Sequence, residues 1–507
     1  MTRAIIVGSG MAGLTAGAYL ARAGCEVEVY EQADHIGGVT HTLRKNGFAW
    51  DLGPMMAEGF GPGEPAGRVL AELGCADRVQ FIRGDRTFSF PDFRISPPAE
   101  YQGPYWRREF FKQIFPHEAD GLDRYYRFYD MVVNLMALTR RAEDGSFPQA
   151  LLAKLRMLPM AGRAKQYMKW SAQDLMDHFF TDPKLKAVFT TILADLTVRP
   201  SEFISLGIPV FNPENSFDRR IPTRISSAGP RLASQFAAGG WGSLVEALAG
   251  VIRESGGKLH TSRSVARIVL KGDRARGIEL AGGERVEADL VLVSGAASEC
   301  FLKLIGRDAL PGDLATKVEG FPLMESVFMV HLGVDMDPSA HQEAILNYYY
   351  RTYEIEEGIA HVQNGDYHEG KDGFLIYVPS MHSPGMAPPG QHAITIYTIA
   401  PNKLAGGWET RRQEMVDKLL DEAEREIPGL REHARVVVSL TPEDFGRLTQ
   451  MPDHHSFGGL RPVMGMTGAP HRTPFEGLWF IGAQSESGAT VNGVLLGARK
   501  ACKMIGV

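Results

Sequence analysis

The first 31 residues constrain the fold of this chain more than any other stretch. An apolar run, RAIIVG, predicts a strand that is buried on both faces, and AGLTAGAYLARAG predicts a helix whose apolar residues share one side. A glycine turn separates them, and after the helix a second strand, EVEVYE, ends at Glu31. This order of strand, glycine turn, helix, strand and acidic residue is typical of a Rossmann-type dinucleotide-binding unit.

The glycine turn reads Gly8-Ser9-Gly10-Met11-Ala12-Gly13. Gly8 permits a tight turn, Gly10 lets the backbone approach a pyrophosphate, and Gly13 lets the helix pack closely on the strand. The first helical residues carry unpaired N–H groups at the positive end of the helix dipole, which favours a phosphate there. We therefore expect cofactor contacts from Gly8, Gly10, Met11, Ala12 and Gly13.

The acidic residue at the end of the second strand selects the nucleotide. Glu31 is placed to accept both ribose hydroxyls of an adenosine, and Gln32 follows it directly. A carboxylate at this position repels a 2′-phosphate. The nucleotide is therefore FAD or NAD and not NADP, and we include both residues among the expected cofactor contacts.

A second glycine pair decides between FAD and NAD. After Glu31 the chain reads QADHIGGVTHTLRKNGFAWDLGPMM, in which Gly37-Gly38 and a later Asp-Leu-Gly-Pro have no role in a simple nicotinamide fold. The arrangement resembles the GG-doublet flavoproteins, the superfamily of amine oxidases, phytoene desaturases, carotenoid isomerases and retinol saturases, which bind FAD in an extended pose. This resemblance implies cofactor contacts from Gly37, Gly38, Val39, Pro54 and Met55.

Two later segments extend the same resemblance. FAAGGWGSLVEALAGVIRESGGKLHTSRSVARIVL, which begins at Phe236, is similar to the second nucleotide segment of the family, where Val265 meets the adenine. RVEADLVLVSGAA, residues 285–297, is similar to the strand that returns to the nucleotide unit. Both segments imply that the nucleotide unit is assembled from distant parts of the chain.

A third segment, LWFIGAQSESGATVNG at residues 478–493, repeats the order of strand, glycine turn and helix near the other end of the chain. In the family this segment closes over the flavin end of FAD, so Gly482 and Ala483 are expected near the ribityl chain and pyrophosphate, and Val491 and Asn492 near the ring. A helix N-terminus there stabilises a reduced, anionic flavin.

The expected fold class is α/β. A discontinuous Rossmann-type FAD-binding domain (1–60, 236–300 and 440–507) is interleaved with an α+β substrate domain (61–235 and 301–439) built on a mixed or antiparallel sheet and containing a helical part. The length of 507 residues suits two or three structural units.

Phrases in the middle of the chain, such as FPHEADGLDRYYRFYDMVVNLMAL and PSMHSPGMAPPGQHAITIYT, resemble the phytoene desaturase group. The resemblance implies an FAD-dependent oxidoreductase that acts on C–C or C=C bonds of a hydrophobic polyene or isoprenoid. Desaturation, saturation and isomerisation all need an apolar pocket stacked on the flavin, so the sequence does not choose among them. The candidates for proton handling are Glu486, His454 and His455.

Two other readings stay open. An amine or amino-acid oxidase requires an aromatic cage, and the C-terminal aromatic pair expected of that cage is missing from the sequence. A non-redox lipid carrier, like the GDP-dissociation inhibitors of prenylated GTPases, shares this architecture without flavin. The complete glycine set and Glu31 favour retained FAD.

Composition narrows the partners and the compartment. With 54 Lys and Arg against 60 Asp and Glu the net charge is −6, which does not favour nucleic acid. Four widely spaced cysteines and no zinc-like spacing predict neither disulfides nor a metal site, as in a cytoplasmic protein. The sequence contains no run of 18 apolar residues, so we expect no membrane-spanning helix.

One segment nevertheless suits a membrane surface. Residues 151–170, LLAKLRMLPMAGRAKQYMKW, carry five basic residues and no acidic one, interleaved with Leu, Met, Tyr and Trp. This composition indicates a peripheral contact with anionic lipid, and a solvated basic face is the alternative. A hydrophobic small molecule is the expected substrate, and the sequence leaves the electron acceptor or donor open.

Overall fold

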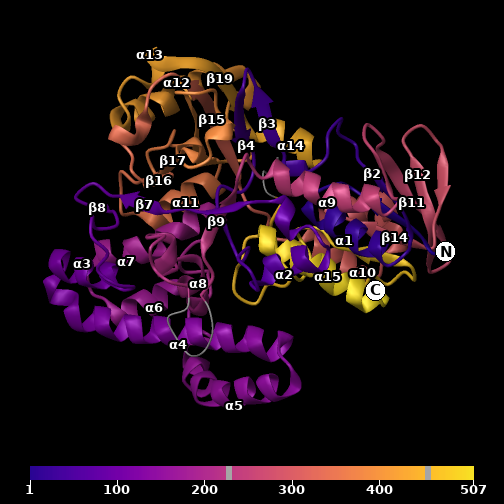
Figure 1. Ribbon diagram of the computed structural model, residues 1–507, viewed down its shortest axis with the longest axis horizontal. Coiled ribbons are helices and arrows are strands. Elements are labelled where there is room, and N and C mark those ends of the chain that lie inside the picture. The colour runs from indigo at the N-terminus through magenta and orange to yellow at the C-terminus, as the bar shows by residue number, and fades with distance from the viewer. Residues whose placement is uncertain (224–230, 452–457) are drawn as a thin grey trace.

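The computed structural model describes residues 1–223, 231–451 and 458–507. These residues form an α/β unit that carries both ends of the chain, a second unit built on a seven-stranded sheet, and a group of helices beside them (Figure 1). The expected α/β class, with a Rossmann-type unit interleaved with an α+β unit, is confirmed.

The first sheet has five parallel strands in the order β10-β2-β1-β14-β20. Its strands are β1 (Arg3–Val7), β2 (Glu26–Tyr30), β10 (Lys258–His260), β14 (Leu290–Val293) and β20 (Leu478–Phe480). Both faces of the sheet are covered, which explains why its strands are continuous apolar runs. The sheet therefore joins segments from the beginning, the middle and the end of the chain.

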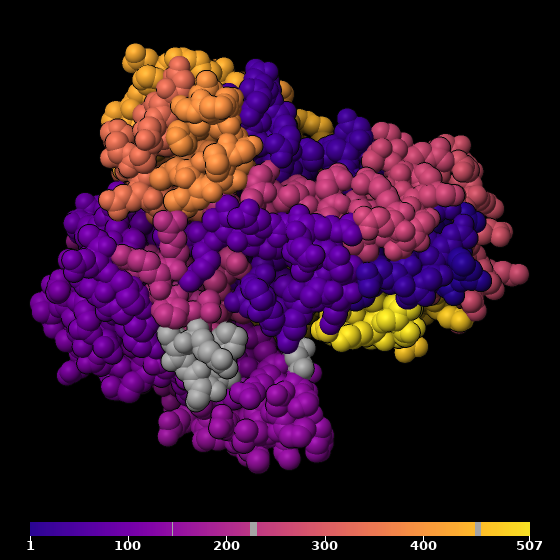
Figure 2. Space-filling view, in the orientation of Figure 1, coloured from indigo at the N-terminus to yellow at the C-terminus, as the bar shows by residue number. Residues whose placement is uncertain are grey.

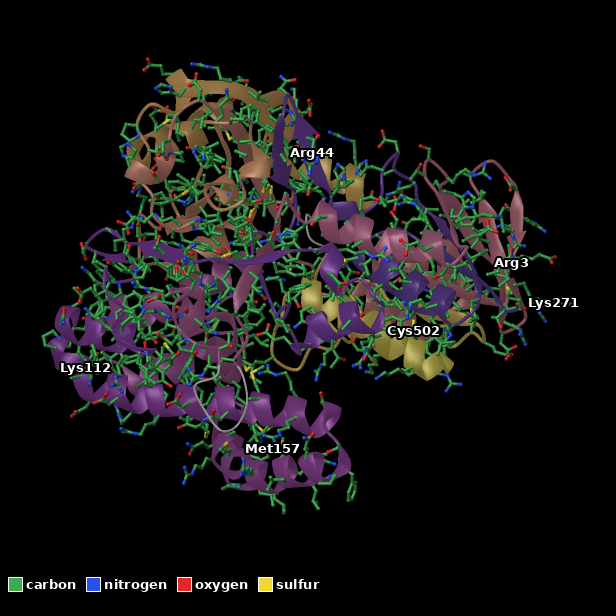
Figure 3. The ribbon with its side chains drawn as sticks, in the orientation of Figure 1. Arg3, Arg44, Lys112, Met157, Lys271 and Cys502 are labelled. Carbon is green, nitrogen blue, oxygen red and sulfur yellow. The ribbon has the colours of Figure 1, made fainter. Side chains whose placement is uncertain are left out.

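Helix α1 (Met11–Arg22) covers one face of this sheet, between α9 (Gly242–Glu254) and α15 (Val491–Ile505). The contact with α15 is close: the Cys502 thiol, labelled in Figure 3, lies 3.8 Å from the carbonyl oxygen of Ala16. The other face packs against α10 (Gly312–Glu319) and an antiparallel sheet of β11 (Val265–Lys271), β12 (Arg274–Leu280) and β13 (Arg285–Glu287).

The seven-stranded sheet has the order β19-β15-β18-β17-β16-β7-β8 and is antiparallel except between β16 and β7. Its strands are β7 (Arg86–Ser89), β8 (Arg94–Ile95), β15 (Ser326–Val334), β16 (Leu346–Tyr349), β17 (Phe374–Tyr377), β18 (His392–Ala400) and β19 (Ala434–Leu440). Alternate residues of β15 face opposite ways: Phe328 and Val330 pack under α12 (Trp408–Glu426), and Val327 and Met329 join the central core.

The helical group carries one element with an exposed apolar face. The group contains α3 (Trp106–Ile114), α4 (Ala119–Asp144), α5 (Phe147–Ala164), α6 (Ala172–Phe179) and α7 (Pro183–Thr190). Ser146 and Gln149 form a capping box that starts α5. Met157, labelled in Figure 3, lies on the side of α5 that packs on α4. Both helices project from the lower side of the body in Figure 2.

Shorter elements connect these parts. β3 (Thr42–Lys45) and β4 (Phe48–Asp51) form a hairpin, and β5 (Ala57–Glu58), β9 (Ser234–Ala237) and β6 (Phe81–Arg83) form a small antiparallel sheet. The remaining α-helices of the described residues are α2 (Pro65–Glu72), α8 (Ile208–Phe211), α11 (Ile355–Gln363), α13 (Leu430–His433) and α14 (Pro442–Thr449). Within the described ranges, we find no helix that is both long and apolar enough to cross a membrane.

Candidate functional site

The turn between β1 and α1 contains three glycines that are needed for different reasons. Gly8 has a φ of +90°, which favours glycine, and a Cβ on Gly13 would lie 2.1 Å from the carbonyl oxygen of Gly8. Gly10 has an ordinary φ of −63°, and of the described residues a Cβ there would meet only Ser294 Oγ, at 3.6 Å. Backbone conformation thus accounts for Gly8 and close packing for Gly13, whereas the bare backbone at Gly10 fits a close-lying ligand.

Glu31 follows β2 and is held by the same turn. Its Oε2 accepts from the backbone N–H of Ser9 at 2.8 Å and from the Ser9 hydroxyl at 2.6 Å, and its Oε1 accepts from the N–H of Ala33 at 3.0 Å. A carboxylate oxygen accepts about two hydrogen bonds. One acceptor position therefore remains, on Oε1, so the carboxylate suits one ribose hydroxyl in this arrangement where the sequence predicted two.

The second glycine pair lies directly against the first turn. Gly37 bridges to Gly10, and its N–H donates to the carbonyl oxygen of Ser9 at 3.0 Å. Gly37 and Gly38 both have positive φ, of 108° and 55°, and a Cβ on Gly37 would lie 2.9 Å from a methyl group of Val245 on α9. The two glycine turns thus form one backbone cradle.

The third turn, between β20 and α15, is shaped by close packing at Gly482 and also borders a cavity. A Cβ on Gly482 would lie 2.0 Å from the carbonyl oxygen of Gly295, which follows β14, so two strand ends meet there. Thr490 caps α15 by accepting from the N–H of Gly493 at 3.0 Å. Val491, the first residue of α15, lines the adjoining cavity. The positive end of this helix therefore faces the cavity.

These turns enclose one end of a cavity of about 460 Å³, which we call the main cavity. Most of the cofactor-binding residues predicted from the sequence line it: Gly8, Gly10, Met11, Ala12, Glu31, Gln32, Gly37, Gly38, Val39, Pro54, Met55, Val265, Ala483 and Val491. Exposed backbone, a helix N-terminus and one ribose acceptor fit the two phosphates and the adenosine of FAD.

The other predicted residues lie elsewhere. Gly13 and Gly482 serve packing, and Asn492 lines a neighbouring cavity. Glu486 is exposed, and its pairing with Lys500 at 2.6 Å lowers the pKa of its carboxyl. The structure thus places Glu486 at the surface, which argues against the proton-handling role predicted for it. His454 and His455 lie outside the described residues.

The far end of the main cavity holds polar residues that the sequence did not reveal. They come from five elements that meet there: Glu58 on β5, Arg86 on β7, Asp195 in the 3-10 helix Thr191–Leu196 that follows α7, Tyr348 on β16 and Tyr397 on β18. The hydroxyl of Tyr348 donates to Asp195 at 2.6 Å, and that of Tyr397 donates to it at 3.1 Å. A carboxyl group is thus fixed in the cavity wall.

Burial controls the charges of this polar end. It raises the pKa of Asp195 to about 6, against the opposing effect of the two tyrosine hydrogen bonds and Arg86. Burial also raises the pKa of Glu58 and lowers that of Arg86. Ionisable groups with shifted pKa values in a cavity are typical of functional sites.

No motif in the sequence identifies these groups, because they come from separate stretches of the chain that have no common pattern. Asp195 lies within TILADL, and Tyr348 within LNYYYRTY. Strand pairing between β16, β17 and β18 brings these residues together, and that pairing is not local in sequence.

Comparison with known proteins supports the binding of a flavin nucleotide in the cradle. Residues 11–505 match the family of flavin-containing amine oxidoreductases. The chain belongs to this family. Its cofactor is FAD, as the sequence predicted, and the nucleotide end of the main cavity supplies the residues that would hold it.

Individual relatives are distant. The chain is 24% identical to pyridine nucleotide-disulfide oxidoreductase domain-containing protein 2 of Rattus norvegicus, over 97% of this chain and 91% of the relative. It is 25% identical to a lycopene-forming phytoene desaturase of Paracoccus sp., over 99% and 96%. The crystal structure of an oxidoreductase from Methanosarcina mazei superposes with a TM-score of 0.64 at 19% identity, covering 99% of this chain and 100% of the other. The resemblance to the phytoene desaturase group is thus supported at low identity, and the fold is shared more widely.

Proposed function

We propose that this protein is an FAD-dependent oxidoreductase that desaturates a C–C bond of a hydrophobic polyene or isoprenoid. The observation that carries the proposal is the apolar stretch of the main cavity beyond the cradle, lined by Met56, Ile192, Leu196, Phe211, Met324, Leu346 and Leu375. Such side chains surround a hydrocarbon without leaving hydrogen-bonding groups unmatched. The likeness to a lycopene-forming phytoene desaturase supports the same substrate class.

A second cavity, of about 760 Å³, gives an extended substrate a route to this stretch. It lies between α2, α4 and α15, and it shares Ala57, Glu58, Phe211 and Thr490 with the main cavity. Its α4 wall includes Tyr129, Val133 and Met136. A long, mostly apolar chain would fill both cavities in turn, whereas a small amine needs only the first.

Bound FAD supplies the acceptor for a hydride taken from the substrate. The protein holds the reacting carbon in an apolar cavity and excludes water from it. The start of α15, at Val491, favours negative charge on the group held beside it. Saturation and isomerisation would use the same apolar cavity. Which reaction occurs therefore depends on whether the flavin is oxidised or reduced when the substrate binds.

We also propose that α5 rests on an anionic membrane and delivers the substrate. A stripe of its apolar residues is exposed at helical spacing, including Phe147 at 81% and Leu158 at 67%. Lys154 and Arg156 flank the stripe and are exposed. Because α5 packs on α4, whose inner side lines the second cavity, lipid held at α5 lies close to the proposed route.

Vesicle flotation tests the membrane contact. The double variant Lys154→Glu and Arg156→Glu is expected to lose most of its binding to anionic vesicles, and Lys271→Glu, an exposed lysine on β11 in the nucleotide unit (Figure 3), to keep it. Equal flotation of the double variant and the unaltered protein would refute the contact.

An anaerobic titration tests the main proposal. The purified protein is mixed with candidate polyenes while its flavin absorption is followed, and bleaching by a polyene supports desaturation. If a polyene instead reoxidises the pre-reduced flavin, the protein is a saturase. Bleaching by an amine alone would favour an amine oxidase, and a colourless purified protein would favour a lipid carrier.

A further inference from the structure

A small cavity lies against the polar end of the main cavity. Asp195, Tyr348 and Tyr397 line both. The small cavity, of about 50 Å³, then runs between α11, β17 and β18 to His368 and Asp372. The side chains of His368 and Asp372 are 39% and 24% exposed. We call this small cavity, from its shared wall at Asp195 to His368 and Asp372, the passage.

Asp195 sits where the main cavity and the passage meet. The ionisable groups that face it are Tyr348 on β16, Tyr350 just after β16, Tyr397 on β18 and Arg86 on β7. Burial raises the pKa of its carboxyl to about 6, so the carboxyl is ionised at neutral pH and takes up a proton readily. The tyrosines stay neutral over this range, because burial raises their pKa values.

The passage can carry a proton away from Asp195. The small cavity, of about 50 Å³, has room for a few water molecules, since one water molecule needs a volume of about 10 to 15 Å³. Within the described part of the chain, the hydroxyl of Tyr367 in the wall is buried without a partner, as a water site would require. At the outer end, Nδ1 of His368 lies 2.9 Å from a carboxylate oxygen of Asp372.

We propose that Asp195 accepts the proton that the substrate loses beside the departing hydride, and that this proton reaches solvent through the passage. The inference rests on the proposed desaturation. FAD, when bound, would accept the hydride from one carbon, the Asp195 carboxylate would take the proton from the neighbouring carbon, and the electron pair of that second C–H bond would become the new π bond. A weak base is sufficient, because the C–H bond becomes acidic as the hydride departs from the neighbouring carbon in the same step.

Anaerobic stopped-flow reduction with a polyene tests the role of Asp195. In the unaltered enzyme the rate of flavin bleaching is expected to rise about tenfold per pH unit below pH 6 and to level off above it, since only the ionised carboxylate accepts a proton. Asp195→Asn should slow bleaching by about 100-fold or more and remove this pH dependence. Retention of the original rate and pH profile by this variant would overturn the proposal.

Two further variants separate chemistry from folding. Tyr397→Phe removes a hydrogen bond that favours the ionised carboxylate, so the midpoint of the pH profile should move upward while KM stays the same. Asp85→Asn is the matched control, because burial also raises the pKa of Asp85 to about 6, yet this residue contacts Arg219 away from the main cavity. A midpoint unmoved by Tyr397→Phe, or moved equally by Asp85→Asn, would contradict the role of Asp195.

A substrate-independent measurement keeps this inference apart from the proposed function. The infrared difference between the unaltered holoenzyme and Asp195→Asn should contain a carboxylic-acid band that disappears as pH rises through about 6. The lack of any titrating band would overturn the role of Asp195 even if polyenes reduce the flavin. If no polyene reduces the flavin, desaturation is refuted, and a titrating band would still support a proton-accepting Asp195 in the cavity wall.

Discussion

Separate replacement of Gly10 and Gly13 by alanine tests whether the cradle is shaped by a ligand or by packing. A Cβ on Gly13 would lie 2.1 Å from a backbone oxygen, so α1 must shift, and we expect a loss of about 3 kcal/mol of stability, the upper end for overpacking. A Cβ on Gly10 meets only Ser294 Oγ among the described residues, at 3.6 Å. The stability of the free protein should then change by less than about 0.5 kcal/mol.

Gly10→Ala should instead weaken the binding of FAD, although it leaves the stability of the free protein almost unchanged. The added methyl group of Gly10→Ala projects toward the main cavity and separates the backbone from the pyrophosphate. We expect FAD affinity to fall at least tenfold, which corresponds to about 1.4 kcal/mol. Thermal unfolding of the apoprotein, together with FAD titration followed by flavin fluorescence, measures both quantities. If Gly10→Ala binds FAD as tightly as the original protein, the ligand-shaped role of Gly10 is wrong.

Three other predictions follow from individual contacts. Glu31→Gln leaves an N–H or hydroxyl donor without an acceptor, because an amide nitrogen cannot accept, and should weaken FAD binding and lower the melting temperature. Arg107→Met leaves the buried Glu214 carboxyl without its ion-pair partner at 3.1 Å and should cost about 3 to 5 kcal/mol in denaturant unfolding. The cost should grow as pH rises, because burial already raises the pKa of Glu214 and its ionised form is the unfavourable one. Glu486→Gln should leave flavin reduction unchanged and alter stability by less than about 1 kcal/mol, because its pair with Lys500 is exposed.

The nucleotide end of the site could be predicted from the sequence because its determinants are local. Gly8, Gly10 and Glu31 stand at fixed spacing along one strand, turn, helix and strand, and the backbone itself forms the cradle. Gly482 shows the limit of this reasoning. A glycine in such a turn was expected near the cofactor, but its close neighbour is the backbone of Gly295, which lies far earlier in the chain.

The polar end could not be predicted from the sequence. Asp195 gains its raised pKa and its hydrogen bonds only when β16 and β18 are in place, and Tyr348 and Tyr397 stand on those two strands, with β17 between them. Glu486 was chosen because it lies near the glycines of the third turn in sequence. Its side chain turns outward to Lys500 instead, since the lysine on the following helix offers it an exposed ion pair.

The order of strands in the five-stranded sheet also has a consequence for biosynthesis. β1 and its neighbour β2 are synthesised early, but the other neighbour of β1, β14, lies in the second half of the chain, and β20 comes later still. The cradle is therefore incomplete during synthesis. One edge of β1 is unpaired, and the surfaces of α1 that contact α9 and α15 are uncovered. Because α15 supplies Val491 to the main cavity, we expect tight FAD binding to follow the synthesis of α15 as a late step.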